Sequence, residues 1–341
     1  MEQYKYFLPE ELIASEPAEP RDAARLLIFC SQTGEIQTDT FLNLDKYLPA
    51  DSLLVLNKTK VLPARVSLKK ETGGRIEVLF LLNEYAEGDA YIKGLVNKKL
   101  EVGQKVSFES GESFLAIGQE KNIFNFQPNF EIKKLPKLLF QFGITPIPKY
   151  LGRTKLSEGE LRERYQSVFA EKPASVAAPT ASLHFTERVF QKLSDKGIQK
   201  EFINLNVGLG TFAPVTEENL KTGKLHEEFY EISKEVFERI KKQKEAGAKI
   251  IAVGTTTVRA LESSARGELA DRTELFIRSP FEFKLVGSLI TNFHLPNSSL
   301  MALVDAFLQF KKSPKSILEI YDFAIQNRFR FYSFGDAMLI V

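Results

Sequence analysis

The sequence contains few of the residues that cross-link a fold or bind a metal. Its 341 residues include one cysteine, three histidines, three methionines and no tryptophan. Because a single cysteine, Cys30, cannot form an internal disulfide, the sequence excludes a small disulfide-stapled secreted domain. The first residues, MEQYKYFLPEEL, carry charge throughout and do not resemble a cleavable signal, so we expect a cytoplasmic protein.

A long hydrophobic run and a strong net charge are missing too. No run approaches the roughly 18 consecutive apolar residues of a membrane-spanning helix, and we expect no membrane partner. The net charge is only +2, whereas proteins that cover long nucleic-acid duplexes are usually strongly basic. Short basic stretches such as NKKLEVGQK (97–105) and RIKKQKEAGAK (239–249) are typical of solvated faces, yet they leave room for a local contact with a folded RNA.

Short alternating segments predict a β domain in residues 61–149. The length of the chain suggests two domains, and the 28 phenylalanines are its main aromatic core residues. Runs of apolar residues separated by glycine and polar turns favour a small antiparallel barrel. These runs are RIEVLFLL (75–82), AYIKGLV (90–96), KVSFES (105–110), SFLAIGQ (113–119) and IFNFQ (123–127).

The rest of the chain alternates between strand and helix patterns. Strands are predicted at 52–57, 201–207, 249–254, 285–293 and 336–341, and helices at 299–310 and 316–329. Thr186 is placed to cap a helix that ends at Gly197, with Phe185 and Phe190 as a hydrophobic staple, and Ser233 to cap another. We therefore predict a discontinuous α/β domain with a largely parallel twisted sheet, residues 1–60 and 150–341, interrupted by an inserted antiparallel β-barrel domain, residues 61–149.

The three histidines are the first candidate site residues. His184, His226 and His294 all lie in loop-like segments, and ligands of α/β proteins bind where strands end and loops begin. A structural role remains open for each of them. Three histidines can also hold zinc in a metal-dependent hydrolase. Because the spacings H-x-H, H-x3-H and C-x2-C are absent, we expect no metal.

The segment AVGTTTVRALES (252–263) is the second candidate. A predicted strand enters a glycine and Thr255, Thr256 and Thr257, and a helix begins there. Free N–H groups at a helix start, together with hydroxyls, suit an anionic or polar ligand, and Arg259 could clamp a carboxylate or phosphate. A plain threonine cap with a surface arginine is the alternative. Neither a P-loop nor a G-x-G-x-x-G frame is present.

Two further segments are weaker candidates. The glycines of NVGLGTFAPV (206–215) would let the backbone approach a flat ligand closely. The segment LVLNKTKVLPARV (54–66) places Asn57 and Arg65 near the predicted domain junction, where they could line a cleft or simply solvate a linker. Glu228 and Asp336 are carboxylates in the candidate segments.

Ten blocks of the sequence, in one order, resemble the signature blocks of the S-adenosylmethionine:tRNA ribosyltransferase-isomerases. The resemblance runs from about Tyr6 to the last residue. The blocks are YFLPEELIASEP (6–17), VLNKTKVLPARV (55–66), GGRIEVLFL (73–81), ITPIPKYLGR (144–153), SVAAPTASLHF (175–185), NVGLGTFAPV (206–215), LHEEFYEI (225–232), AVGTTTVRALES (252–263), TNFHLPNSSLMALVDAF (291–307) and YSFGDAMLI (332–340).

The resemblance implies an activity in queuosine biosynthesis. Members of this family transfer and isomerise the ribosyl part of S-adenosylmethionine onto 7-aminomethyl-7-deazaguanine at the tRNA wobble position. The products are epoxyqueuosine-tRNA, adenine and methionine. S-adenosylmethionine would then be a substrate, no cofactor would be needed, and the partner would be a tRNA anticodon stem-loop. The family fold is likewise an α/β domain interrupted by a β-barrel, and we expect a monomer.

The resemblance also suggests roles for the candidate residues. His184 and His294 are expected to be acid/base groups, because histidine suits proton transfer near neutral pH, and His226 with Glu228 an orienting pair. The threonine turn and Arg259 would hold the amino-acid end of S-adenosylmethionine, and the GLGTF loop its adenine or the acceptor base. The full substrate-binding set is Asn57, Arg65, Thr180, Thr211, Phe212, Thr255, Thr256, Thr257, Arg259, Asn292 and Asp336.

The sequence departs from the family pattern at several positions. Ser182 replaces the usual glycine, Leu209 a small residue, and Gly223 an additional histidine of many members, while Lys58 and Lys60 replace the commoner Asn/Asp and Arg. Ser182 and Leu209 are expected to add bulk beside the pocket. A divergent paralogue with an altered substrate is therefore one alternative. A non-catalytic RNA-binding module that uses the β domain is another.

Overall fold

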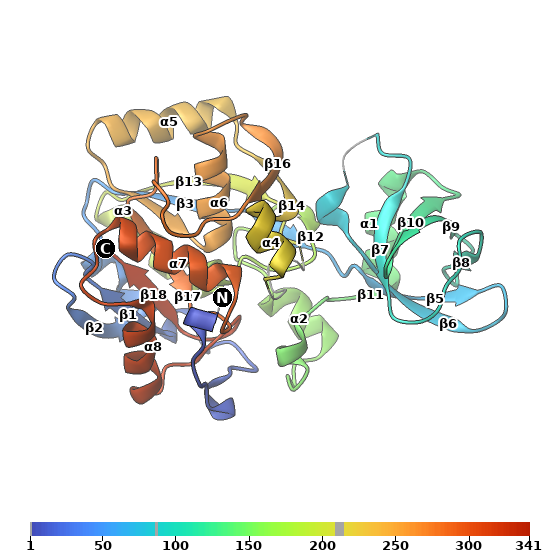
Figure 1. Ribbon diagram of the computed structural model, residues 1–341, viewed down its shortest axis with the longest axis horizontal. Coiled ribbons are helices and arrows are strands. Elements are labelled where there is room, and N and C mark those ends of the chain that lie inside the picture. The colour runs from blue at the N-terminus through green and yellow to red at the C-terminus, as the bar shows by residue number, and fades with distance from the viewer. Residues whose placement is uncertain (1, 86–87, 209–214) are drawn as a thin grey trace.

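The chain folds into an α/β part and a smaller β-barrel part, which lie side by side (Figure 1). The computed structural model describes residues 2–85, 88–208 and 215–341. No helix within these ranges is long and apolar enough to cross a membrane.

A nine-stranded sheet forms the centre of the α/β part. Its order is β16-β14-β13-β3-β15-β17-β18-β1-β2. The strands are β1 (Arg25–Phe29), β2 (Ile36–Thr40), β3 (Leu53–Asn57), β13 (Gln199–Leu205), β14 (Lys224–Glu231), β15 (Ile250–Val253), β16 (Ala270–Leu275), β17 (Ser288–Asn292) and β18 (Ala337–Ile340). The four central strands β13, β3, β15 and β17 are mutually parallel, and β18 runs antiparallel to β17 but parallel to β1. The predicted α/β sheet with a parallel centre is confirmed.

Helices cover both faces of the sheet, which is why β3, β15 and β17 are buried along their whole length. On one face, Leu53 and Val55 pack in the same core as α5 (Lys234–Glu245), α6 (Thr255–Ser264), α7 (Ser299–Phe310) and α8 (Ile317–Gln326). On the other face, Leu54 and Leu56 pack with α3 (Glu187–Asp195) and the 3-10 helix η4 (Phe41–Tyr47). Successive residues of β3 therefore point to opposite faces of the sheet and belong to two separate hydrophobic cores.

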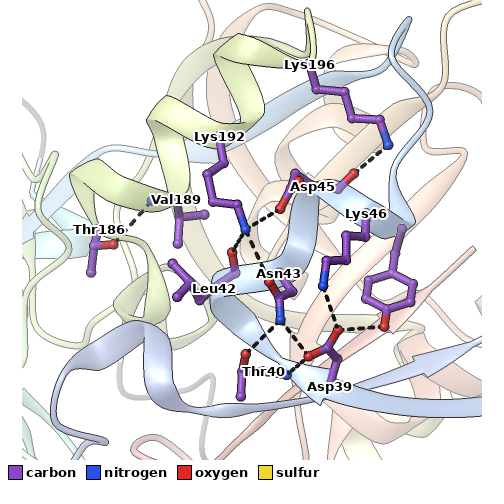
Figure 2. Close-up of polar contacts among 11 residues, drawn as sticks. Asp39, Thr40, Leu42, Asn43, Asp45, Lys46, Thr186, Val189, Lys192 and Lys196 are labelled. Carbon is purple, nitrogen blue, oxygen red and sulfur yellow. Dashed lines mark hydrogen bonds and ion pairs between the residues drawn. The ribbon is translucent and has the colours of Figure 1, made fainter.

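Lys192 in α3 and Lys196 directly after it bind the helix to η4 (Figure 2). Lys192 Nζ donates to the carbonyl of Leu42 at 3.0 Å and lies 3.0 Å from Asp45 Oδ1, and Lys196 Nζ donates to the carbonyl of Asp45 at 2.6 Å. The 3-10 helix η8 (Thr180–His184) directly precedes α3. The lysine contacts therefore hold α3 in place directly after the segment that carries His184.

The predicted helix boundaries of α3 and α5 are confirmed. Thr186 Oγ1 accepts from Val189 N at 3.4 Å, and Gly197 follows the helix with φ +83°. The rings of Phe185 and Phe190 stack with centroids 5.1 Å apart, as expected of a hydrophobic staple. Ser233 caps α5 in the same way as Thr186 caps α3.

Six antiparallel strands close the barrel, because the first strand, β5, pairs with both β6 and β8. The strands are β5 (Arg65–Lys70), β6 (Arg75–Phe80), β7 (Ile92–Val96), β8 (Lys105–Ser107), β9 (Ser113–Glu120) and β10 (Ile123–Pro128), with the short β11 (Gly143–Ile144) added beside β5. Phe80, Phe114 and Phe126 fill the interior, and α1 (Leu135–Phe142) packs on the same core. The predicted antiparallel barrel is confirmed.

A small parallel pair of strands marks the place where the chain passes between the two parts. Strand β4 (Thr59–Val61) pairs with β12 (Lys172–Ser175), and the hydroxyls of Thr59 and Ser175 are 2.6 Å apart. The 3-10 helix η5 (Leu82–Glu84), which follows barrel strand β6, approaches Gly208 of the α/β part closely. A side chain at Gly208 would collide with η5, because an added Cβ atom would lie 2.5 Å from Asn83 Nδ2. The division into domains at residues 60 and 150 stays a prediction.

Several elements were missing from the sequence prediction. These are η1 (Glu2–Tyr4), η2 (Glu10–Leu12), η3 (Arg21–Ala23), α2 (Glu158–Arg164), α4 (Glu217–Thr222), and strands β2, β14 and β16. Strand β14 matters most for the site, because His226 was expected in a loop and instead lies within this strand. A bulge between Lys224 and Glu228 interrupts the pairing of β14 with β16 there.

Candidate active site

A pocket opens at the carboxyl ends of the central parallel strands, where ligands of α/β sheets usually bind. Its internal volume is about 30 Å³. One part of its wall carries hydroxyl, amide and imidazole groups, from Thr180, Thr255, Thr256, Thr291, Asn292 and His294. The lining also includes aromatic and aliphatic side chains, from Tyr150, Phe293, Leu295, Leu300 and Tyr332, and the hydroxyl of Ser333. The site therefore suits a ligand with one polar and one flat apolar portion.

The amino terminus of α6 forms part of the polar wall. Gly254, between β15 and α6, has φ +87° and ψ 152°, a conformation that side-chain-bearing residues rarely adopt. Thr255 and Thr256 follow it at the start of the helix, where backbone N–H groups have no partner within the helix. Thr257 was predicted to bind substrate, but its hydroxyl donates to the carbonyl of Val253 at 2.7 Å. Two of the three predicted threonines thus line the pocket.

Asn292, the last residue of β17, has an amide whose orientation is fixed by three neighbours. Thr180 Oγ1 donates to Asn292 Oδ1 at 2.9 Å. Asn292 Nδ2 faces the carbonyl of Asp336 at 3.4 Å and His184 Nε2 at 3.2 Å. Because the oxygen of the amide is occupied as an acceptor, Nδ2 is the donor to the imidazole. Asn292 is therefore held rigidly at the pocket wall.

His184 lies behind Asn292 rather than on the pocket wall. Its Nε2 accepts the hydrogen bond from Asn292, which requires an unprotonated nitrogen at that position. Burial, together with the positive charges of Arg330 and Arg21, lowers the pKa of His184 to about 3. His184 is therefore a neutral imidazole that contacts Asn292 from behind the pocket wall, and its expected acid/base role stays a prediction.

His294, two residues after the end of β17, lines the pocket. Its Nε2 is 2.8 Å from Thr291 Oγ1, and its backbone N–H donates to the hydroxyl of Tyr321 at 2.9 Å. The hydroxyl of Tyr6 donates to its carbonyl. Burial lowers the pKa of His294 to about 3, so its ring is neutral at physiological pH. A neutral imidazole has one ring nitrogen that can donate a hydrogen bond and one that can accept a hydrogen bond.

Arg259 is buried in an ion pair instead of reaching into the pocket. Its guanidinium pairs with Glu228 and donates from Nε to the carbonyl of Leu275 at 3.1 Å. Glu228 Oε1 also accepts from the backbone N–H of Gly208 at 2.9 Å. The expected carboxylate or phosphate clamp is therefore corrected. Arg259 joins α6 to β14 and, through Glu228, to the residue at which the GLGTF loop begins.

The expected pairing of His226 with Glu228 is corrected by the same contacts. Glu228 is buried against Arg259, whereas His226 is exposed at the bulge of β14. A bulge shifts the alternation of side chains along a strand, so two residues that are two positions apart need not share a face. Whether His226 contacts a substrate stays a prediction.

Three other predicted substrate-binding residues are engaged elsewhere. Asn57 is buried, accepts from the backbone of Leu205 at 3.1 Å and donates back to its carbonyl at 3.0 Å, so it braces β13 against β3. Arg65 lies on the barrel and forms an ion pair with Glu77 at 2.8 Å. Asp336 accepts from the backbone N–H groups of Arg25 and Arg330 and from the guanidinium of Arg330. In this structure all three make supporting contacts, and their direct roles in substrate binding stay predictions.

Thr211, Phe212 and Leu209, in the GLGTF loop, lie outside the described residues. Ser182 is fully buried in η8, and its hydroxyl has no partner among the residues that the structure describes. It follows Ala181, which lines the pocket, so Ser182 lies beside the pocket wall rather than on it. Gly223 adopts φ +69° at the end of α4, a left-handed conformation that suits glycine.

The sequence missed part of the aromatic wall. Tyr150, Tyr332 and Ser333 line the pocket, and the hydroxyls of Tyr150 and Ser333 are 2.7 Å apart. The blocks ITPIPKYLGR and YSFGDAMLI contain them, but nothing in their spacing indicated that they meet. Within the described ranges, no group of three or more His, Cys, Asp or Glu side chains is placed to hold a metal ion. The hydrolase alternative has no support there.

Comparisons with known proteins cover almost the whole chain. The family model described as "Queuosine biosynthesis protein" matches residues 1–340. The chain is 44% identical to an S-adenosylmethionine:tRNA ribosyltransferase-isomerase from Carboxydothermus hydrogenoformans, covering 100% of the chain and 99% of that protein. It is also 44% identical to one from Thermotoga petrophila, with 99% of each covered. A crystal structure of S-adenosylmethionine tRNA ribosyltransferase from Thermotoga maritima is 34% identical, has a TM-score of 0.55, and is matched over 99% of this chain and 100% of that one. With its barrel, its parallel strands and this match along its length, the chain belongs to the family of queuosine biosynthesis enzymes.

Proposed function

We propose that the chain is an S-adenosylmethionine:tRNA ribosyltransferase-isomerase. It would transfer and isomerise the ribosyl part of S-adenosylmethionine onto 7-aminomethyl-7-deazaguanine at the wobble position, with release of adenine and methionine. The observation that carries this proposal is the agreement with relatives of that name over the full length of the chain. The pocket supports it, because its polar and flat apolar portions suit the two ends of S-adenosylmethionine.

S-adenosylmethionine is a substrate in this proposal, so the reaction needs no separate cofactor. Its carboxylate would bind at the start of α6, near the free backbone N–H groups and the hydroxyls of Thr255 and Thr256. The partial positive charge at a helix amino terminus favours an anion there. The second substrate is a tRNA anticodon stem-loop. A monomeric state and a cytoplasmic location remain predictions.

His294 is the acid/base group that the geometry favours. Its ring at the pocket wall would accept the C5′ proton beside the sulfonium and return a proton to the departing adenine. This role requires bound substrate to raise the pKa of the ring well above its value of about 3, because an acid/base group works best with a pKa near the operating pH. Thr291 would hold the ring through the contact at Nε2. His184 and Thr180 would act indirectly, by keeping the amide of Asn292 in place.

The test of the function is adenine release from S-adenosylmethionine in the presence of tRNA that bears the 7-aminomethyl base. We expect release with this tRNA and none with the same tRNA carrying guanine at the wobble position. Binding of the modified tRNA without any release of adenine would instead indicate a non-catalytic RNA-binding protein. Release with the guanine-bearing tRNA alone would indicate a divergent paralogue.

Single variants test the assigned roles. The His294→Gln variant should lower kcat by about 100-fold or more, the usual contribution of a positioned acid/base group. The Thr255→Val variant should mainly raise KM for S-adenosylmethionine. Thr222→Val is its matched control, because Thr222 is an exposed threonine on α4. Unchanged kcat in a folded His294→Gln variant would remove that residue from the mechanism.

A further inference from the structure

Tyr332 is held in a backbone conformation that is costly for a bulky side chain. Its φ is +71°, in the left-handed region. Five non-glycine residues in the described ranges have a positive φ, and Tyr332 is the aromatic one among them. Hydrogen bonds fix the turn: Tyr332 N donates to the carbonyl of Phe293 at 3.1 Å, and Gly335 N donates to the carbonyl of Tyr332 at 3.0 Å. A glycine would adopt this φ without steric cost, so the ring has to offset the strain.

The ring of Tyr332 forms an aromatic wall with Tyr150. Their ring centroids are 4.8 Å apart at an interplanar angle of 52°, and both residues line the pocket. Tyr150 belongs to the 3-10 helix η7 (Lys149–Leu151), on the segment that returns from the barrel, and it is only partly buried. Phe331, the residue before Tyr332, packs against Tyr6 and Tyr321. Both rings of the Tyr150–Tyr332 pair form part of the pocket lining.

We propose that Tyr150 and Tyr332 are a stacking platform for a flat purine-like base. The proposal rests on the proposed function, in which two such bases enter the site: the adenine of S-adenosylmethionine and the 7-deazaguanine of the tRNA. Aromatic side chains bind nucleobases through the π faces that both bases share. The polar wall at Thr255 and Asn292 belongs to the same pocket, so charged portions of a substrate and a stacked base can be bound together.

The experiment measures equilibrium binding to Tyr332→Phe and Tyr332→Leu variants, which separates binding from turnover. One arm titrates S-adenosylhomocysteine, an unreactive adenine nucleoside, and the other titrates tRNA bearing the 7-aminomethyl base. The leucine variant should bind one of them at least about tenfold more weakly, whereas the phenylalanine variant should stay within about threefold of wild type because the ring is retained. Loss in the first arm assigns the platform to adenine, and loss in the second assigns it to the tRNA base.

Phe329→Leu is the matched control, because Phe329 packs against Phe293, with centroids 5.7 Å apart, but away from the pocket wall. It should bind both ligands as wild type does. If Tyr332→Leu does not fold, Tyr150→Leu, at the partly exposed ring, is judged by the same criteria. Wild-type binding of both ligands by a folded leucine variant would overturn the platform.

The outcome for the platform is separable from the outcome for the function. Absence of adenine release by the wild-type chain would overturn the proposed function, while nucleoside and tRNA binding by the variants would still decide the platform. A wild-type chain that binds neither ligand would overturn both. Adenine release with unchanged binding and KM in the Tyr332→Leu variant would overturn the platform alone.

Discussion

Burial decides the charge of the two histidines at the site. Both His184 and His294 have a pKa lowered to about 3, chiefly because the interior disfavours the charged ring. The unfolded chain therefore binds more protons than the folded chain between about pH 3 and 6.5. Stability from these residues is fully present above pH 6.5 and is lost as the pH falls below that value toward 3.

The pH dependence can be assigned to one residue with His184→Gln, since glutamine can accept from Asn292 but does not titrate. Wild type should lose up to about 1.4 kcal/mol of unfolding free energy per pH unit and per histidine below pH 6.5. The His184→Gln variant should keep only the pH dependence of the unfolding free energy that is due to His294. Urea denaturation at about pH 7.5 and about pH 5 measures the difference. Equal slopes for variant and wild type would show that His184 does not titrate on unfolding.

The sequence identified which residues matter at the site better than it identified what they do. Five of the predicted residues line the pocket, and their roles in binding stay predictions: His294, Asn292, Thr180, Thr255 and Thr256. Roles depend on burial and on partners that are far apart in the chain, and no local pattern encodes either. The ion pair of Arg259 with Glu228 is an example, because a surface arginine and a buried one look the same in the sequence.

At the level of elements, this buried ion pair connects α6, β14 and the start of the GLGTF loop. Glu228→Gln would leave the charge of Arg259 buried without its counter-ion, at a cost of about 3–5 kcal/mol in unfolding free energy. The exposed pair of Arg153 with Glu10 offers a matched control, Glu10→Gln, which should cost less than about 1 kcal/mol. Chemical denaturation compares the two. Equal losses of unfolding free energy in the two variants would mean that water reaches the Arg259–Glu228 pair.

Elements with local signals were predictable and those at the edge of the sheet were not. Capping residues such as Thr186 and Ser233 act within one turn, so the sequence alone places the starts of α3 and α5. Strand β16 is the edge strand and β14 is its neighbour; both are rich in charged residues, and a bulge breaks the alternation of β14. Tertiary pairing, rather than local pattern, makes them strands.

At the level of the whole molecule, the barrel can be removed at a point where its two chain connections meet. Arg65 pairs directly with Ile144 across β5 and β11, so a short Gly–Ser linker can replace residues 66–143. All pocket-lining residues among the described ones lie outside that segment. The shortened chain should therefore unfold in one cooperative transition and still bind S-adenosylhomocysteine, as circular dichroism and calorimetry would show. Loss of cooperative unfolding would mean that the α/β part depends on the barrel to fold.

The pairing of β1 with β18 has a consequence for the order in which the chain folds. Arg25 and Asp336, which meet at this pairing, are 311 positions apart in the sequence. Contacts of such long range are slow to form, because the loop between them loses conformational entropy before any pairing compensates for it. Strand β18 also pairs with β17, which carries Asn292 into the pocket. Competence to bind substrate should therefore be acquired late, and until then β17 and β1 present open edges on which newly made chains can aggregate or be protected by chaperones.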